Sequence, residues 1–308
     1  MEVETMNEER QIYEKIEIEA EKGTNFEILN ATTKGKLVII VKKNKAGIYS
    51  ENYMYPPILD GYKAVKNEWL AWKNGFIIER ISDGSQFGWV PVGYLDSNGI
   101  FNGCDTEKFG RRKYGNCWYF EEYRDPMNDE LLLMYESVKK YGGFYISRYD
   151  MSINEKNGKL QSVKNVMPWN TFKIEEAIKA AATFENNEKV KSHMMYGSEV
   201  DTVLEWFIDS GARTRYEVIK NSKNWGNYAS DIQKTGSDEK YCTNGIYDFT
   251  GNGDKLTQEM SKYGPTLRGG YGFNHDRSAY NRCFKHIGEF KSRYCDDDLT
   301  FHIALWIA

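Results

Sequence analysis

The sequence lacks three features that would assign it to a familiar class. Its longest aliphatic run, residues 37–41 (LVIIV), is far shorter than the ~20 apolar residues of a membrane-spanning helix, so membrane insertion is not expected. Basic residues are not in excess: the 41 Lys and Arg face 45 Asp and Glu, and a net charge of -4 argues against a nucleic-acid partner. Residues 1–5 (MEVET) lack the basic and apolar regions of a secretory signal, so we expect a cytoplasmic or virion-associated protein.

Metal-binding patterns are also scarce. The five cysteines are an odd number, widely scattered, and contain no C-x-x-C pair, which argues against a disulfide framework or a structural zinc site. The four histidines include no H-E-x-x-H spacing, and the run Asp296-Asp297-Asp298 is more typical of a solvated loop than of a calcium site. We therefore predict no metal and no cofactor.

What is present is enough apolar material for a large core, since 40% of the 308 residues are hydrophobic and 15% are aromatic. Pro56, Pro57 and Gly61 break the chain, which predicts a boundary near residue 55. Residues 1–55 would form a small N-terminal segment, with a charged helix over 1–22 and a strand over 36–42. Residues 56–308 would form the main domain.

The main domain combines short strands with helices. Residues 75–80 and 87–92 flank a Ser-Asp-Gly-Ser turn, which is typical of a β-hairpin. Helices are expected over 129–140, from Asn170 or Thr171 to Thr183, and over 198–210, where Ser198 and Asp201 form a near capping box. Strands are expected over 142–149 and 301–307, and an irregular insertion over 95–128. The fold class is α+β, with two main helices and many short strands.

The order of these pieces resembles the formylglycine-generating-enzyme-like (sulfatase-modifying factor) family, a variant of the C-type lectin fold. The similar segments are residues 87–93 (FGWVPVG), 142–149 (GGFYISRY), 166–170 (VMPWN), 196–206 (YGSEVDTVLEW), 244–252 (NGIYDFTGN), 267–270 (LRGG) and 301–305 (FHIAL). They cover roughly residues 57–308 in order. The resemblance implies a C-type-lectin-like domain after residue 55.

Two departures argue against the family's enzymatic branch. The oxidases carry a copper-binding cysteine pair after the RGG strand, whereas Cys283 stands alone here, and one thiol cannot supply paired soft ligands for Cu(I). Where relatives have a Glu that helps to bind Ca²⁺, this chain has Lys255, which would place a cation at a metal ligand's position. The sequence therefore predicts a protein that is not an enzyme.

Residues 271–284 and 292–303 contain no Lys, Glu, Gln, Met or Trp, although these five types make up about a quarter of the chain. Every residue type present there has a codon ending in C, the set reached when adenines of an AAC codon are replaced. The region about 268–303 thus resembles the variable region of proteins diversified by retroelements. A loop-rich binding face would favour a similar composition without any diversification.

We therefore expect a non-catalytic protein that binds a protein or cell-surface ligand through rigid aromatic anchors with adaptable polar neighbours. Receptor binding at a phage or prophage tail would fit this expectation. Two alternatives are a metal-dependent oxidase-type enzyme and a structural virion component, and the oligomeric state is open. The expected ligand-binding residues are Tyr271, Phe273, Asn274, His275, Asp276, Arg277, Tyr280, Arg282, Phe284, Arg293, Tyr294, Asp296, Asp297 and Asp298.

Overall fold

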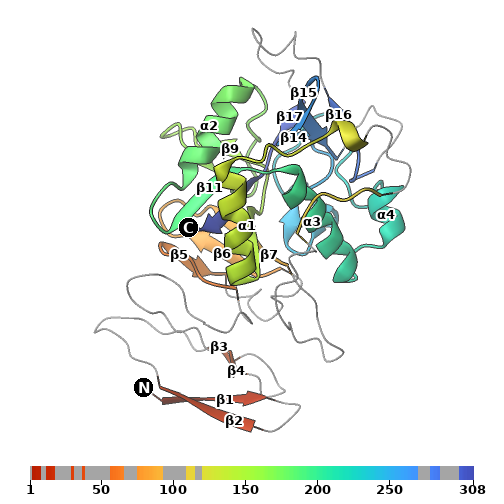
Figure 1. Ribbon diagram of the computed structural model, residues 1–308. Coiled ribbons are helices and arrows are strands. Elements are labelled where there is room, and N and C mark those ends of the chain that lie inside the picture. The colour runs from red at the N-terminus through yellow and green to blue at the C-terminus, as the bar shows by residue number, and fades with distance from the viewer. Residues whose placement is uncertain are drawn as a thin grey trace.

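The computed structural model describes residues 56–65, 75–92, 109–114, 120–269, 278–284 and 298–308, together with the backbone of four short strands before residue 39. Within these residues the protein is of the mixed α+β class, with four α-helices and several mainly antiparallel sheets (Figure 1). The expected class is confirmed.

The largest sheet has six strands in the order β11-β18-β8-β7-β6-β5. The expected hairpin is its β6–β7 pair, with Ile78 opposite Phe87. The C-terminal strand β18 lies between the edge strand β11 and β8, so it is hydrogen-bonded on both sides. The strands are β5 (Tyr62–Ala64), β6 (Ile77–Arg80), β7 (Gln86–Pro91), β8 (Gly143–Ser147), β11 (Val190–Met194) and β18 (Ile303–Ile307).

A four-stranded sheet has the order β16-β15-β14-β17. Its central strands β14 and β15 are antiparallel, β16 is antiparallel to β15, and β17 runs parallel to β14. The strands are β14 (Asp254–Ser261), β15 (Gly264–Arg268), β16 (Arg282–Phe284) and β17 (Leu299–Thr300). Two strand pairs complete this part: β9 (Ser152–Ile153) with β10 (Leu160–Gln161), and β12 (Cys242–Thr243) with β13 (Ile246–Tyr247).

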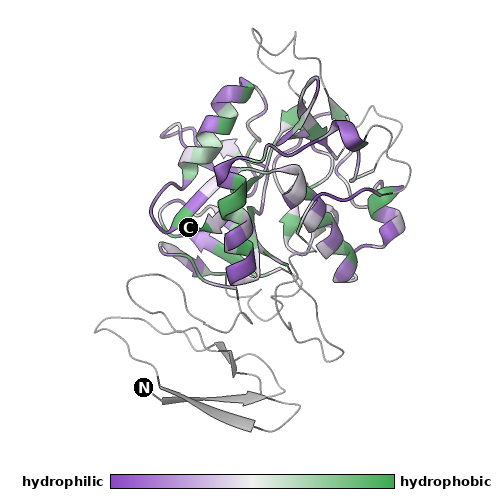
Figure 2. Ribbon diagram, viewed as in Figure 1, coloured by the Kyte–Doolittle hydropathy of each residue, from purple (hydrophilic) through white to green (hydrophobic). Residues whose placement is uncertain are grey.

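The helices are α1 (Asp129–Tyr141), α2 (Ile174–Phe184), α3 (Gly197–Asp209) and α4 (Arg215–Ile219), and two 3-10 turns span Phe120–Glu122 and Glu239–Tyr241. Helix α1 begins after Asn128, whose side chain accepts a hydrogen bond from the Leu131 N–H, and it ends at Gly142 with a φ of 75°. Three of these helices match the sequence expectations. Figure 2 shows that they carry both hydrophobic and hydrophilic residues, as expected of helices that cover a sheet.

Two helix starts were assigned wrongly. Helix α2 begins at Ile174 rather than after Asn170 or Thr171. Ser198 does not cap α3: the helix begins after Tyr196, whose N–H donates to Glu199, while Ser198 donates its hydroxyl to Asp125. Asp125 also accepts the N–H groups of Gly197 and Ser198 at 2.8 Å, so a distant carboxylate performs the capping that local spacing assigned to Ser198.

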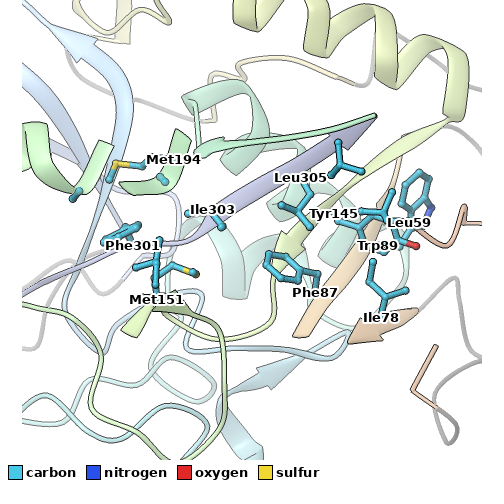
Figure 3. Close-up of a cluster of buried hydrophobic side chains, with 14 of the residues drawn as sticks. Leu59, Ile78, Phe87, Trp89, Tyr145, Met151, Met194, Phe301, Ile303 and Leu305 are labelled. Carbon is cyan, nitrogen blue, oxygen red and sulfur yellow. The ribbon is translucent and has the colours of Figure 1, made fainter. Parts of the chain in front are cut away.

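The hydrophobic core occupies both faces of the six-stranded sheet. Along β18, Leu305 joins a cluster with Phe87 and Tyr145 beneath α2, while Ala304 and Trp306 join a second cluster that includes side chains from α1 and α3. Figure 3 shows the first cluster, with labelled side chains from β6, β7, β8 and β18. This alternation follows from the period of two residues in a strand. The strand expected over 301–307 is present as β18, and its residues Ile303, Leu305 and Ile307 are all buried.

The helix expected over residues 1–22 is wrong. The backbone forms an antiparallel hairpin of β1 (Glu2–Asn7) and β2 (Ile12–Glu17), followed by a pair of β3 (Leu29–Asn30) and β4 (Leu37–Val38). β-branched residues such as Val3, Thr5 and Ile16 favour extended backbone, and this preference outweighs the weak helical stripe. The boundary near residue 55 stays a prediction.

Candidate functional site

The expected binding face is mostly outside the described residues. Residues 270–277 and 285–297 are not among them, and with them lie Tyr271, Phe273, Asn274, His275, Asp276, Arg277, Arg293, Tyr294, Asp296 and Asp297. Four expected residues are described: Tyr280, Arg282, Phe284 and Asp298. Of Phe284 only the backbone is described, opposite Thr266 in β16.

Tyr280 was expected on an exposed face, and that expectation is wrong. The side chain is 4% exposed, and its ring meets the Tyr114 ring edge-on, with the centroids 4.4 Å apart. Its hydroxyl accepts the Tyr114 N–H at 3.1 Å and donates to the carbonyl of Arg112. Tyr280 therefore fixes the 109–114 segment against the end of β15 and β16, and it is part of the scaffold.

Arg282 is also buried, with 0% of its side chain exposed. Its guanidinium pairs with Asp201 of α3 and lies 3.0 Å from Glu259 of β14. Arg268, at the end of β15, pairs with the same two carboxylates, and its own distance to Glu259 is 3.1 Å. We call Asp201, Glu259, Arg268 and Arg282 the charged frame.

Two members of the charged frame, Asp201 and Arg282, are ionised at neutral pH. Burial opposes ionisation of Asp201, but the two facing guanidinium groups hold the pKa of this carboxyl below its usual value. Burial likewise opposes the charge of Arg282, yet Asp201 and Glu259 raise the pKa of the guanidinium well above its usual range. Arg111 adds a third guanidinium, 2.8 Å from Glu259. Removal of any one of these side chains would leave a buried charge without a partner, so we expect substitutions in the charged frame to destabilise the protein.

The ends of the 270–277 segment are tied to this frame and to its neighbours. The carbonyl of Gly269 accepts hydrogen bonds from Thr250 at 2.7 Å and from Tyr228 at 3.2 Å. On the other side, the Ser278 hydroxyl donates to the carbonyl of Ile219 at 2.8 Å, and the Ala279 N–H donates to Ser222 at 2.6 Å. Both ends are therefore held in position by buried groups from several elements.

Asp298, the first described residue after the 285–297 segment, lies at the same end of the four-stranded sheet as Arg268. Asp298, which is half-buried, accepts the Asp254 N–H at 2.8 Å with its carbonyl, and β17 then pairs with the start of β14. In the same register Lys255 lies opposite Arg268, the last residue of β15. Arg268 and Asp298 thus lie at the same end of the central strands β14 and β15, whereas Phe284, before the second segment, lies opposite Thr266 further along β15.

Lys255 fills a site for a cation. Its ammonium lies 2.8 Å from Oδ1 and 2.9 Å from Oδ2 of Asp150, 2.7 Å from the Thr300 hydroxyl and 2.6 Å from the Gly251 carbonyl. The Asn252 carbonyl lies 3.4 Å away. We call these oxygens the Lys255 cage. Since the side chain is 6% exposed, the ammonium supplies inside the protein the positive charge that the oxygens require.

A buried Ser–His–Asp arrangement beside this cage was missed by the sequence analysis. Nδ1 of His302 lies 3.0 Å from both the hydroxyl and the carbonyl of Ser147, and Nε2 lies 3.3 Å from Asp150. Because the carbonyl can only accept, Nδ1 carries the proton and cannot act as a base toward the Ser147 hydroxyl. Ser147 and Asp150 are 0% exposed and His302 is 3% exposed, so we interpret the trio as structural. Only folding joins residue 302 to 147, and no spacing signals it.

Burial and the neighbouring charge of Lys255 shift the pKa values of His302 and Asp150. Burial and then the nearby Lys255 ammonium lower the pKa of His302 to about 3. Burial raises the pKa of Asp150 to about 6, even though Lys255 acts in the opposite direction. At neutral pH the His302 imidazole is therefore uncharged, while Asp150 is ionised and paired with Lys255.

Other candidate chemistry is limited in the part of the chain that the structure describes. Cys242 and Cys283 form no disulfide with a described residue, and burial raises the pKa of Cys242 above its usual value, so the Cys242 thiol is protonated at neutral pH. Among the described side chains no three His, Cys, Asp or Glu residues gather as a metal site would require. The described helices are too short or too polar to cross a bilayer.

Comparison with known proteins adds no assignment: the chain matches no family model and no curated protein.

Proposed function

We propose that this chain is a non-catalytic ligand-binding protein that uses the 270–277 and 285–297 segments as its binding surface. In this proposal the domain has the C-type lectin fold of the formylglycine-generating-enzyme type. Its variable region resembles that of proteins diversified by retroelements, and a protein or a cell surface is the ligand, as in receptor binding by a phage.

The charged frame is the observation that carries the proposal. A surface that tolerates many sequences needs flanking residues that keep their position whatever the sequence between them. Arg268 and Arg282 lie opposite one another in β15 and β16, and both are held by Asp201 and Glu259. The frame thus supports the chain on both sides of residues 270–277.

The composition of the two segments is consistent with a binding surface that is held by a separate, fixed scaffold. Residues 271–284 include Tyr, Phe, Asn, His, Asp, Arg and Ser, the aromatic and short polar types that serve in adaptable binding loops. Tyr280 and Arg282 are buried and contact other parts of the domain, so we remove them from the proposed binding surface. The proposed ligand contacts are therefore the remaining residues of the expected set.

A binding experiment tests the proposal. Fluorescently labelled protein is incubated with a panel of bacterial cells, and a triple variant Tyr271→Ala, Phe273→Ala and Tyr294→Ala is compared with the unaltered chain. We expect the triple variant to melt at nearly the same temperature, since each exposed substitution costs within about 0.5 kcal/mol, and to lose binding to the cells that the unaltered chain recognises. The control is Tyr216→Ala, which removes a 65% exposed tyrosine from α4 and should change neither property.

Several outcomes would overturn the proposal. Unchanged cell binding by the triple variant would place the ligand surface elsewhere, and a large loss of melting temperature would place these aromatic residues in the core. Stoichiometric copper or iron in the purified protein would favour the oxidase-type alternative. If no reverse-transcriptase gene and no repeat of the 3′ coding end lie beside the gene, the diversification part fails while the binding part stands.

A further inference from the structure

His193 occupies a buried position between three elements of the second core cluster. It belongs to β11, where it lies opposite Ala304 of β18, and its side chain is 1% exposed. Nε2 lies 2.8 Å from Oε1 of Glu199 in the first turn of α3, and Nδ1 lies 3.2 Å from the indole nitrogen of Trp306 in β18. One imidazole therefore connects a helix N-terminus to the C-terminal strand.

The hydrogen-bond partners determine which ring nitrogen carries the proton. An indole N–H can only donate, so Nδ1 must be the unprotonated acceptor. The Glu199 carboxylate can only accept while it is ionised, and it also accepts the Tyr196 N–H at 2.7 Å, so Nε2 carries the proton. The arrangement is complete only when His193 is neutral.

The carboxylate of Glu130 is a second possible hydrogen-bond acceptor near Nδ1 of His193. Oε2 of Glu130, in the first turn of α1, lies 3.8 Å from Nδ1 and accepts the Tyr196 hydroxyl at 2.6 Å. The Glu130 side chain is 34% exposed, which gives solvent protons access to this side of the ring. A movement on the order of 1 Å would bring the carboxylate to hydrogen-bonding distance of Nδ1.

The electrostatic surroundings favour the imidazolium. The carboxylates that face His193 are Glu199 from α3, Glu130 from α1 and Asp125 from the segment before α1, while β18 contributes the uncharged Trp306. Burial opposes the charge, but the three carboxylates prevail and hold the pKa of His193 above its usual value. Protonation would set the Nδ1–H against the indole N–H, two donors that repel one another.

We propose that His193 is a proton-operated selector that bonds Trp306 of β18 when neutral and Glu130 of α1 when protonated. Mild acid would release the indole from its acceptor and strengthen the contact between β11 and α1. The selector does not depend on the proposed ligand-binding function. It would make the hydrogen bonding of the C-terminal strand, which lies between β11 and β8 in the six-stranded sheet, responsive to pH.

NMR of the indole N–H groups tests the selector. The ¹⁵N-labelled chain is titrated from pH 8 to pH 5, and the signal of Trp306 among the eight tryptophans is assigned with Trp306→Phe. We expect the Trp306 indole signal to move upfield with the same midpoint as the His193 ring signals, because its hydrogen bond is lost on protonation. A Trp306 signal that stays constant while His193 titrates, or a His193 that does not titrate in this range, would overturn the proposal.

Three variants test separately the contributions of His193 and Glu130 to the pH response of Trp306. His193→Gln offers an uncharged donor and acceptor, so the Trp306 signal should become independent of pH. Glu130→Gln should lower the midpoint by about one pH unit, because one facing carboxylate is lost. Glu136→Gln, an exposed residue of the same helix, should leave the midpoint unchanged. Persistent titration of Trp306 in His193→Gln, or equal midpoints for the two glutamate variants, would contradict the assignment, and melting curves confirm that each variant is folded.

Discussion

Replacement of Lys255 by Met tests whether the Lys255 cage is a cation site that the protein fills with its own side chain. The ammonium lies within 2.9 Å of both Asp150 oxygens and also bonds Thr300 and Gly251. Met retains much of the side-chain volume, so the substitution removes charge and hydrogen bonds rather than packing.

The expected cost follows from the burial of Asp150. The carboxylate is 0% exposed, and without Lys255 it keeps only uncharged partners such as the Asn252 amide at 3.2 Å and the Thr300 hydroxyl. Loss of one partner of a buried pair leaves an uncompensated charge and costs roughly 3–5 kcal/mol. The second substitution Asp150→Leu removes that charge, so the double variant should be more stable than Lys255→Met alone, even though it has lost more hydrogen bonds.

The assay is urea unfolding at pH 7.5 and at pH 5.5. The destabilisation of Lys255→Met should shrink at the lower pH, because a protonated Asp150 needs no counter-charge and its pKa is already about 6 beside the lysine. Lys262→Met is the control: this lysine is 54% exposed and pairs with Glu122 at 3.1 Å, so its loss should cost less than about 1 kcal/mol. A Lys255→Met cost below 1 kcal/mol, or a double variant less stable than the single one, would refute the reasoning.

Three further predictions concern the scaffold. Leu305→Ala empties a position that is 0% exposed and should reduce the free energy of unfolding by roughly 2–5 kcal/mol in a denaturant titration; a loss below that range would mean that the site collapses around the smaller side chain. Tyr280→Phe leaves the Tyr114 N–H and the Arg112 carbonyl without their partner and should cost about 1–3 kcal/mol, whereas a value near zero would show that water replaces the hydroxyl. The lowered pKa of His302 implies stability that is present above pH ~6.5 and is lost as the pH falls toward 3. Between pH 7 and pH 4 the unaltered chain should therefore lose about 3 kcal/mol relative to His302→Gln, and parallel curves for the two chains would contradict this.

Local sequence patterns predicted correctly those helices and strands in which the spacing of apolar residues or a turn motif favours a single type of secondary structure. The apolar run at residues 301–307 predicted a strand, and in the structure this strand places Leu305 in one core cluster and Trp306 in the other. The turn between β6 and β7 and the body of α1 and α3 were predicted for the same reason. The N-terminal hairpin was missed because residues 1–22 have a weak helical stripe and also many β-branched residues, so the local preferences conflict.

The candidate site could be predicted only in part. Composition pointed to the region around residues 268–303, but composition says nothing about which side chains face inward. Arg282 and Tyr280 were assigned to the exposed face because Arg and Tyr are common in binding loops. Arg282 is buried against Asp201 and Glu259, and Tyr280 is buried against Tyr114, and all three of these partners lie elsewhere in the chain.

The sequence by itself determined the α+β class and the positions of the main helices and strands. Each of these properties is encoded by residues that are close together in the chain. Only the tertiary structure decided the charged frame, the Lys255 cage and the choice of partners around His193. Each of these joins residues from distant parts of the chain, such as Asp150 with Lys255 and His193 with Trp306, and an ion pair or hydrogen bond forms only where the packed core excludes water and holds the two groups within about 3 Å.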